Sequence, residues 1–435
     1  MPNERHPMPV DPNRRRLLQR GLTACGVLAV GPLLWGNAAG SPRPAQPMAA
    51  PMRRSNIPNL ANTLQEIAVE NDPGTRMLVP RGFAVREVAR TGRPARCGGD
   101  YPWHPYPDGG AVFPTNDGGW IYVSNSEVDI PRQGGVGALR FNAGGDLVDS
   151  YSICQGTTNN CAGGPTPWGT WLSCEETDEG LVFECDPLGR EPAVAAPALG
   201  MFKHEAAAVD PVGRRIYLTE DVEDGGFYRF TPDHYPRGGR PDLRSGRLEV
   251  AVVTGDDPLQ TRPVTWEPVP VPVPRLVGKD GPPEETPTRY QVAGSEAFDG
   301  GEGCWYHDGV VYFTTKGDNR VWAVDTVADT IDVVYDKASD AAFNPGIDDV
   351  DNLTISAGGD LVVAEDGAEM RLVVVGPDVQ PFELVNVLGQ RGSEITGPAF
   401  SPDGSRLYFS SQKGKTGEGT DGRTYEMRGP FFIDA

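Results

Sequence analysis

Short apolar segments separated by turns make up most of this 435-residue chain. One pattern recurs, in which aromatic or aliphatic residues are followed by a small hydroxyl residue or alanine and then by polar residues. Its six copies are residues 121–124, 170–173, 216–219, 311–314, 361–364 and 407–410. Segments this short, rich in aromatic and β-branched residues and bounded by Gly, Pro and Asp, predict β-strands.

The six copies follow one another at a nearly constant spacing. Their central residues, 49, 46, 95, 50 and 46 positions apart, are Tyr122, Trp171, Tyr217, Tyr312, Val362 and Tyr408. A period of about 40–50 residues is typical of a propeller blade. The long step contains a Pro-rich segment, residues 263–287. We interpret this segment as an extended excursion, either a cap or a plain linker, and not as a seventh repeat.

Turns containing Asp and Gly precede these strands, for example at residues 116–119 and 401–404. Such turns supply the positive-φ positions that a β-hairpin needs. The repetition predicts an all-β fold, a six-bladed β-propeller, because a β-sandwich would not repeat at the length of a blade. We expect residues 75–435 to form this single domain, with the Pro-rich excursion between the third and fourth repeats.

Acidic residues occur at two recurrent places in the repeats. One set stands about ten to fourteen positions before a central residue, and comprises Glu205, Glu302, Asp351 and Glu394. A second set follows the central residues, and comprises Glu175, Glu176, Glu220, Asp221, Glu365 and Asp366, with Lys316 at the matching place in the fourth repeat. The first set precedes the strands expected to be innermost, so a propeller would bring both sets to one mouth of its central channel.

Carboxylates gathered in this way repel one another unless cations neutralise them. Few basic residues occur near these positions, namely Lys203, Lys316, Arg320 and Arg391. Carboxylate-rich sites favour hard cations such as Ca²⁺, Mg²⁺, Mn²⁺ or ferric iron, and the five histidines show no zinc-like spacing. The alternative is that the acids cap turns or face solvent at the rim. Asp–Gly pairs are interpreted as turns, not as ligands.

Composition and the N-terminus restrict partners and location. A formal net charge of −21 argues against nucleic acid as a partner. Residues 13–19, NRRRLLQ, resemble the twin-arginine export motif, and an apolar run at 21–35 follows. This run is too short for a permanent membrane anchor, although a lipid anchor at Cys25 is the alternative. We expect residues 1–50 to be a signal peptide and linker, the twin-arginine translocase to be a partner during export, and the protein to be periplasmic or extracellular.

Export into an oxidising compartment makes disulfides the default expectation for the cysteines that follow the leader. These are Cys97, Cys154, Cys161, Cys174, Cys185 and Cys304. For Cys161 the expected partner would be Cys154 or Cys174.

The stretch NNCAGGPTPWGTWLSCEE, residues 159–176, is similar to the hallmark motif of the PhoX family of secreted alkaline phosphatases. The resemblance extends to FKHEAAAVDP (202–211), GEGCWYHDGVVYFTTKGDN (301–319), DNLTISAGGDLVVAEDG (351–367) and EITGPAFSPDGSRLYFSS (394–411). It covers most of residues 75–415 and identifies the chain as a short member. It implies a six-bladed propeller whose axis holds Fe³⁺ and Ca²⁺, and hydrolysis of a small phosphoester substrate. We also expect the protein to be a monomer.

The resemblance also implies a set of ligands, in which a cysteine thiolate bridges the irons and carboxylates supply most other donors. In this sequence the implied metal ligands are Cys161, Glu175, Glu176, Glu205, Glu220, Glu302, Asp351, Glu365, Asp366 and Glu394. The cations would hold the phosphate oxygens and stabilise charge on the leaving oxygen.

One feature departs from the family pattern. In larger members of the family we expect an arginine two residues before the glutamate that matches Glu302, and Gly300 stands at this place. Lys316 or Arg391 could replace it, so Glu302, Lys316 and Arg391 are the candidate catalytic residues. Two alternatives to a phosphatase stay open. One is a propeller that keeps the metals for stability and binds a ligand or partner without turnover, and the other is a calcium-dependent hydrolase of the lactonase type.

Overall fold

The structure, a computed structural model, describes residues 54–96, 98–237, 239–275, 285–339, 346–367, 369–375 and 380–433. The predicted signal peptide, Cys25 and Cys97 lie outside these residues. Within them the chain is almost entirely β-structure, with four short 3₁₀ helices, η1 (Ile57–Leu60), η2 (Pro197–Leu199), η3 (Thr288–Tyr290) and η4 (Gly419–Asp421).

Most strands belong to four-stranded antiparallel units, in which consecutive strands along the chain pair with one another. In the first half of the chain they are β5 (Pro107–Pro114), β6 (Trp120–Ser126), β7 (Gly134–Phe141) and β8 (Leu147–Thr157); β9 (Asn160–Pro165), β10 (Trp171–Glu175), β11 (Val182–Cys185) and β12 (Val194–Ala195); and β13 (His204–Asp210), β14 (Arg215–Glu220), β15 (Phe227–Pro232) and β16 (Gly246–Val253). In the second half they are β18 (Gly301–His307), β19 (Val310–Thr315), β20 (Arg320–Asp325) and β21 (Thr330–Asp336); β22 (Val350–Ile355), β23 (Leu361–Glu365), β24 (Arg371–Val375) and β25 (Phe382–Leu388); and β26 (Ile395–Phe400), β27 (Arg406–Ser411) and β28 (Arg423–Arg428).

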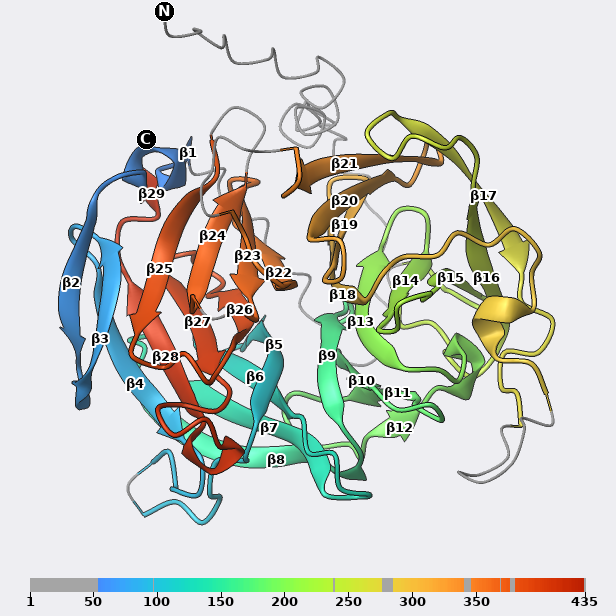
Figure 1. The fold of residues 1–435 in the computed structure, drawn as a ribbon. Helices are drawn as coiled ribbons and strands as arrows, with labels where there is room; N and C mark the ends of the chain where they lie inside the picture. Colours follow the sequence, from blue (N-terminus) through green and yellow to red (C-terminus); the bar gives the residue numbers. More distant parts are fainter. Residues whose placement is uncertain are drawn as a thin grey trace, which may run out of the picture.

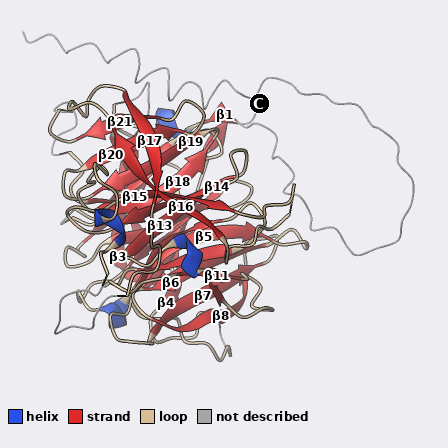
Figure 2. Ribbon diagram, turned by 90° about the vertical axis from the view of Figure 1, so that its right-hand side faces the viewer, coloured by secondary structure: helices blue, strands red, loops and turns tan. Residues whose placement is uncertain are grey.

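The first strands of these units surround one axis. They are β5, β9, β13, β18, β22 and β26, called the inner strands below. Each contacts the next along the chain, and β26 contacts β5, so that the inner strands form a ring. Figure 1 looks onto this ring, around which the chain passes from blue to red, and Figure 2 shows the molecule from the side. The architecture is a β-propeller.

Strands from the N-terminal part of the described chain close the fold. β4 (Ala84–Arg90) pairs with β28 and becomes the fourth strand of the unit that begins with β26. β3 (Asp72–Pro80) pairs with β25, and β2 (Leu64–Val69) extends the same sheet. β1 (Arg54–Ser55) pairs with β29 (Phe432–Ile433). The β-structure therefore begins upstream of residue 75, the predicted start of the domain.

Both faces of the sheets are covered by neighbouring units, and this explains why the second strands read as continuous apolar runs. The repeats recognised in the sequence lie in these second strands, β6, β10, β14, β19, β23 and β27. β6, β19 and β23 are buried along their whole length. Val123 of β6 shares a hydrophobic cluster with Trp171 and Cys185 of the following unit, so the core lies between adjacent units.

The described part of the Pro-rich excursion lies beside the unit that begins with β13. β17 (Arg262–Pro268) pairs with β16 and, through its first residues, with β21. Residues 285–300 then run through η3 to the start of β18 (Figure 1). Arg289 of η3 donates a hydrogen bond to Glu220 at 2.8 Å and so joins the excursion to β14. Among the described residues, no helix is long and apolar enough to cross a membrane.

Candidate metal centre

The inner strands share an irregularity near their first residues. The register shifts shortly after Pro107, Asn160, His204, Gly301, Val350 and Thr396, where two or more residues of the inner strand face fewer residues of the second strand. Such bulges bend a strand and redirect the side chain beside them. In β5, β9, β13, β18 and β22 the residue beside the shift is Asp108, Cys161, Glu205, Glu302 and Asp351. We call this set the inner positions.

A second set comes from the residue that follows the last residue of each second strand. These are Glu127, Glu176, Asp221, Lys316, Asp366 and Gln412, called the outer positions below. In the antiparallel pairs the end of the second strand lies opposite the start of the inner strand, as Glu175 lies opposite Asn160. Inner and outer positions therefore meet at one end of the propeller axis.

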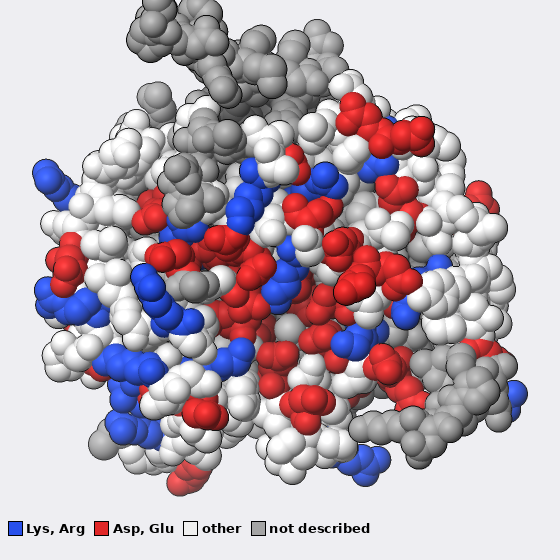
Figure 3. Space-filling model, viewed as in Figure 1, with Lys and Arg blue, Asp and Glu red and all other residues white. Residues whose placement is uncertain are grey.

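Potential ligand atoms from the two sets, together with Glu394, which directly precedes β26, gather into four overlapping groups. The groups are Asp108, Glu127 and Cys161; Cys161, Glu176 and Glu205; Glu205, Glu302 and Asp351; and Asp351, Asp366 and Glu394. Within each group one ligand atom per residue lies within 4.8 Å of the others. We call these residues the acidic centre. Figure 3 shows Asp and Glu gathered in the middle of this face, with Lys or Arg side chains among them.

Glu205 is the clearest sign that the acidic centre accommodates cations. Its side chain is 1% exposed, and neither carboxylate oxygen has a hydrogen-bond partner among the described residues. Burial raises its pKa well above the ordinary value, and the charges of Glu302 and Glu176 raise it further. A buried carboxylate without a partner is costly, and a bound cation would remove this cost.

The same forces act on the neighbouring groups. Burial, with nearby carboxylates contributing, raises the pKa of Glu127 and of Asp351 to about 8 and that of Glu176 to about 7. Burial also raises the pKa of the Cys161 thiol, and the charges of Asp108 and Glu205 add to this effect. A cation would reverse these shifts, because it favours the ionised forms that bind it.

Three lysines of the described residues contact the acidic centre. Lys316 Nζ lies 2.5 Å from Asp366 Oδ2 and 3.5 Å from Glu302 Oε1. Lys413 Nζ lies 2.6 Å from Glu394 Oε1, and Lys203 Nζ lies 3.3 Å from Glu176 Oε1. The lysines offset only part of the negative charge, since Glu205 keeps two oxygens without a partner.

Three predicted ligands have another role in the structure. Glu175, Glu220 and Glu365 end their strands, and their side chains lie outside the acidic centre. The Glu175 carboxylate accepts hydrogen bonds from the N–H groups of Thr158 and Leu181. These oxygens hold the loops beside the strand, which corrects the expectation that they face the axis.

The other two acids are held by arginines. Glu220 pairs with Arg289 and also accepts hydrogen bonds from Tyr228 Oη and the Gly226 N–H. Glu365 pairs with the buried guanidinium of Arg371, whose Nη2 lies 2.5 Å from Oε1. Because successive residues of a strand point to opposite sides, the next residue, Asp366, reaches the axis instead.

Arg391 lies at the surface. Its side chain is 76% exposed, and Nη2 lies 3.4 Å from Glu369. Gly300, where the resemblance led us to expect arginine, adopts φ +69°, and a Cβ built there would lie 3.5 Å from Lys316 Cβ. A side chain at this position would be strained, because φ > 0 favours glycine.

Two members of the acidic centre were missed in the sequence. Asp108 belongs to an Asp–Gly pair, a pattern not predicted to supply ligands, although it stands 14 positions before Tyr122, as Glu394 does before Tyr408. Glu127 stands 5 positions after Tyr122, the same offset as Glu176 after Trp171. Gln412 Nε2 donates to both Asp108 and Glu127 at 2.6 Å.

The five cysteines that the structure describes are free thiols, Cys154, Cys161, Cys174, Cys185 and Cys304. This contradicts the expectation of a disulfide between Cys161 and Cys154 or Cys174. Cys161 instead takes part in two groups of the acidic centre.

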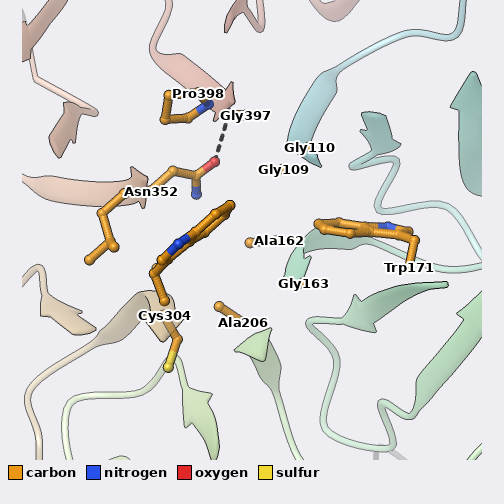
Figure 4. Close-up of a pocket in the computed structure, with 13 residues that line it drawn as sticks. Gly109, Gly110, Ala162, Gly163, Trp171, Ala206, Cys304, Asn352, Gly397 and Pro398 are labelled. Carbon is orange, nitrogen blue, oxygen red and sulfur yellow. Dashed lines mark hydrogen bonds between the residues drawn. The ribbon is translucent and has the colours of Figure 1, made fainter. Parts of the chain in front are cut away.

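Beneath the acidic centre the inner strands pack closely. A cavity of about 20 Å³ is lined there by small residues, among them Gly109, Ala162 and Ala206 (Figure 4). Gly303 also lines it. A Cβ built on Gly109 would lie 2.5 Å from Ala162 Cα, and one on Gly303 would lie 2.8 Å from Asn352 Cα. The cavity has room for about one water molecule, so the axis beneath the centre leaves little space for a ligand.

The donor set and the burial of the acidic centre both suit a cluster of cations. Carboxylate oxygens favour Ca²⁺ and other hard ions, and a thiolate is a ligand for iron. Residues 137–342 match the family profile described as "Alkaline phosphatase PhoX". This match, which spans just under half of the chain, supports a PhoX-type alkaline phosphatase. It supports a metal-dependent phosphatase that acts on phosphoric monoesters.

Solved structures agree with the fold. PhoX of Pseudomonas fluorescens, in complex with the transition-state analogue vanadate, is 17% identical and superposes with a TM-score of 0.69. The match covers 88% of this chain and 99% of that chain. A gluconolactonase of Xanthomonas campestris is 12% identical, with a TM-score of 0.42 and coverage of 87% and 94%. The latter likeness is too remote to support an argument about function. No curated protein matches the chain at a significant level.

Proposed function

We propose that this PhoX-type phosphatase hydrolyses phosphomonoesters at a multi-metal cluster held by the acidic centre. The observation that carries the proposal is Glu205, which has two buried oxygens without a hydrogen-bond partner and belongs to two overlapping groups of potential ligands. Because Glu205 and Asp351 each belong to two groups, both carboxylates are suited to bridge neighbouring ions.

Ca²⁺ and Fe³⁺ are the proposed cations. The ligand set proposed for them is Asp108, Glu127, Cys161, Glu176, Glu205, Glu302, Asp351, Asp366 and Glu394. Cys161 is the only sulfur in it, and it would be the iron ligand by virtue of its softer donor atom. When bound, the cations would neutralise phosphate oxygens and stabilise negative charge on the leaving oxygen.

The chain itself would orient the substrate at the open face of the acidic centre. Lys203 and Lys413 extend to this face with about one third of their side chains exposed, so they are suited to attract an anionic ester. Arg391 is more exposed, and it replaces the missing arginine in our proposal. Glu302 acts as a metal ligand and Lys316 as its neighbouring cation.

We further propose that the four-stranded units are the blades of a six-bladed propeller, in keeping with the six repeats.

The protein would be exported by the twin-arginine pathway, which carries folded proteins, and would act as a monomer outside the cytoplasm. The support is the NRRRLLQ motif followed by an apolar run.

Metal analysis combined with turnover of p-nitrophenyl phosphate tests the proposal. Protein exported by its native host should contain calcium and iron, lose turnover after chelation, and regain it when both ions are supplied. Glu302→Ala removes one ligand and should lower kcat/KM by about 100-fold or more, together with metal content. Calcium alone, without turnover and unchanged by Glu302→Ala, would contradict the proposal.

A further inference from the structure

One of the outer positions carries a positively charged side chain. Asp or Glu occupies four of them, Gln412 occupies one, and Lys316 is the one cation among them. All six lie in the described chain, directly after the second strands. Since the positions are equivalent by repeat, lysine stands here where four of the five other repeats place a carboxylate.

Lys316 joins two parts of the acidic centre. Its Nζ lies 3.5 Å from Glu302 Oε1 and 2.5 Å from Asp366 Oδ2. Glu302 and Asp366 belong to different groups of ligand atoms, and these groups share Asp351. The ammonium thus lies between two carboxylates in the way that a bridging cation would.

The backbone fixes this lysine in place. The Lys316 N–H donates to the Gly300 carbonyl at 2.8 Å, directly before β18. Lys203 and Lys413 each form an ion pair with one carboxylate of the acidic centre, whereas Lys316 lies near two.

An independent observation shows that these surroundings suit cations. The nearby Glu205 is buried, and neither of its carboxylate oxygens has a hydrogen-bond partner among the described residues. The carboxylates around Lys316 therefore hold more negative charge than the chain itself neutralises.

We propose that the ammonium of Lys316 takes the place of a metal ion between Glu302 and Asp366, so that the acidic centre binds one cation fewer than its geometry allows. This inference rests on the proposed metal centre and does not depend on phosphatase turnover. Lys316 is accordingly a positioning residue, because its ammonium reduces the repulsion between two metal ligands, Glu302 and Asp366.

A change of lysine to glutamate tests the proposal by making this position like its equivalents. Lys316→Glu alters the charge by −2, which one divalent cation would balance. After dialysis of the full chain against buffered calcium, elemental analysis should find about one more calcium per chain than in the wild type. In chelator the variant should melt at a lower temperature than the wild type, and calcium should raise its melting temperature by more.

Lys203→Glu is the matched control. It changes the charge equally, and its side chain is 34% exposed compared with 33% for Lys316, but its ion pair involves a single carboxylate. Its calcium content should equal that of the wild type. An equal gain in both variants would reveal a general charge effect and would overturn the proposal.

Other outcomes are also decisive. Equal calcium in wild type and Lys316→Glu would overturn the role of Lys316 while leaving the metal centre intact. No metal in either protein would overturn both. If Lys316→Glu does not fold, Lys316→Gln carries the same expectation of one added calcium, since it also frees Glu302 and Asp366. Metal uptake without phosphatase activity would overturn only the proposed function.

Discussion

At Glu205, burial and charge oppose each other. Glu205 is the second residue of the inner strand β13, and its side chain is 1% exposed. Neither carboxylate oxygen has a hydrogen-bond partner among the described residues. Most buried polar groups in proteins are hydrogen-bonded, so this residue lowers the stability of the metal-free fold. A cation shared with Glu302 or Cys161 would turn the cost into binding energy.

Glu205→Gln separates these two effects. In chelator at about pH 8 the variant should unfold at the same temperature as the wild type or higher, because it removes a group that ionises at a cost. With calcium and iron present it should be stabilised less, since its metal affinity should fall by about 100-fold. Thermal unfolding with and without metal measures both. Equal destabilisation in the two conditions would instead assign Glu205 a structural role.

At the scale of the element, the last residue of a second strand and the residue after it have different roles. In β10 the last residue, Glu175, turns to the loop and accepts two backbone N–H groups. The following residue, Glu176, lies in the acidic centre beside Cys161 and Glu205. The alternation of side chains along a strand thus separates a structural acid from a metal ligand one position away.

Neutral variants of this adjacent pair should therefore behave differently. Glu176→Gln should lower metal affinity by about 10- to 100-fold, because it removes a charged donor. Glu175→Gln should leave metal content unchanged and reduce the free energy of unfolding by about 1–2 kcal/mol, because it weakens the charged acceptor of two hydrogen bonds. Elemental analysis and urea unfolding distinguish the two. Loss of metal in both variants would contradict the assignment of Glu176 as a metal ligand and Glu175 as a structural acid.

At the scale of the whole molecule, the ring of inner strands concentrates charge. Each unit contributes only one or two acids, yet closure of the ring brings them together in four overlapping groups. Figure 3 shows the result as an acidic patch in the middle of one face. The free energy that closes the ring must therefore exceed the repulsion among these groups, or cations must reduce that repulsion.

The metal-free protein should consequently lose stability as pH rises. Glu176, Glu127 and Asp351 have ordinary pKa values of 4.5, 4.5 and 3.8, which the fold raises to about 7, 8 and 8. The folded state holds protons that the unfolded chain has released, so this contribution is complete below about pH 4 and is lost as pH rises through about 7–8. Between its ordinary and its raised pKa, each such group should lower the free energy of unfolding by about 1.4 kcal/mol for each unit that the pH rises.

Urea unfolding in chelator between about pH 5 and about pH 8 measures this slope. The same series with saturating calcium should show a shallower or opposite slope, because bound cations favour the ionised carboxylates. A metal-free protein that is as stable at the upper pH as at the lower one would contradict the expectation.

Much of the fold could be predicted from the sequence because its signals are local. The aromatic strand around Tyr122 or Tyr408, with its preceding turn, recurs at a fixed spacing, and every such segment forms a second strand. The acids before these strands were also recognisable, since Glu205, Glu302 and Asp351 each lie beside the register shift of an inner strand.

The sequence by itself determined the repeat, the acidic character of the strand starts and the position of the lone cysteine among them. Only the tertiary structure decided which acid of each adjacent pair faces the axis, why Asp108 is a member and not a turn residue, and that Lys316 lies between two carboxylates. These outcomes depend on bulges, loop hydrogen bonds and ring closure, which place residues far apart in the chain within a few ångströms. No local pattern encodes such distances, because they arise only when all the units pack around one axis.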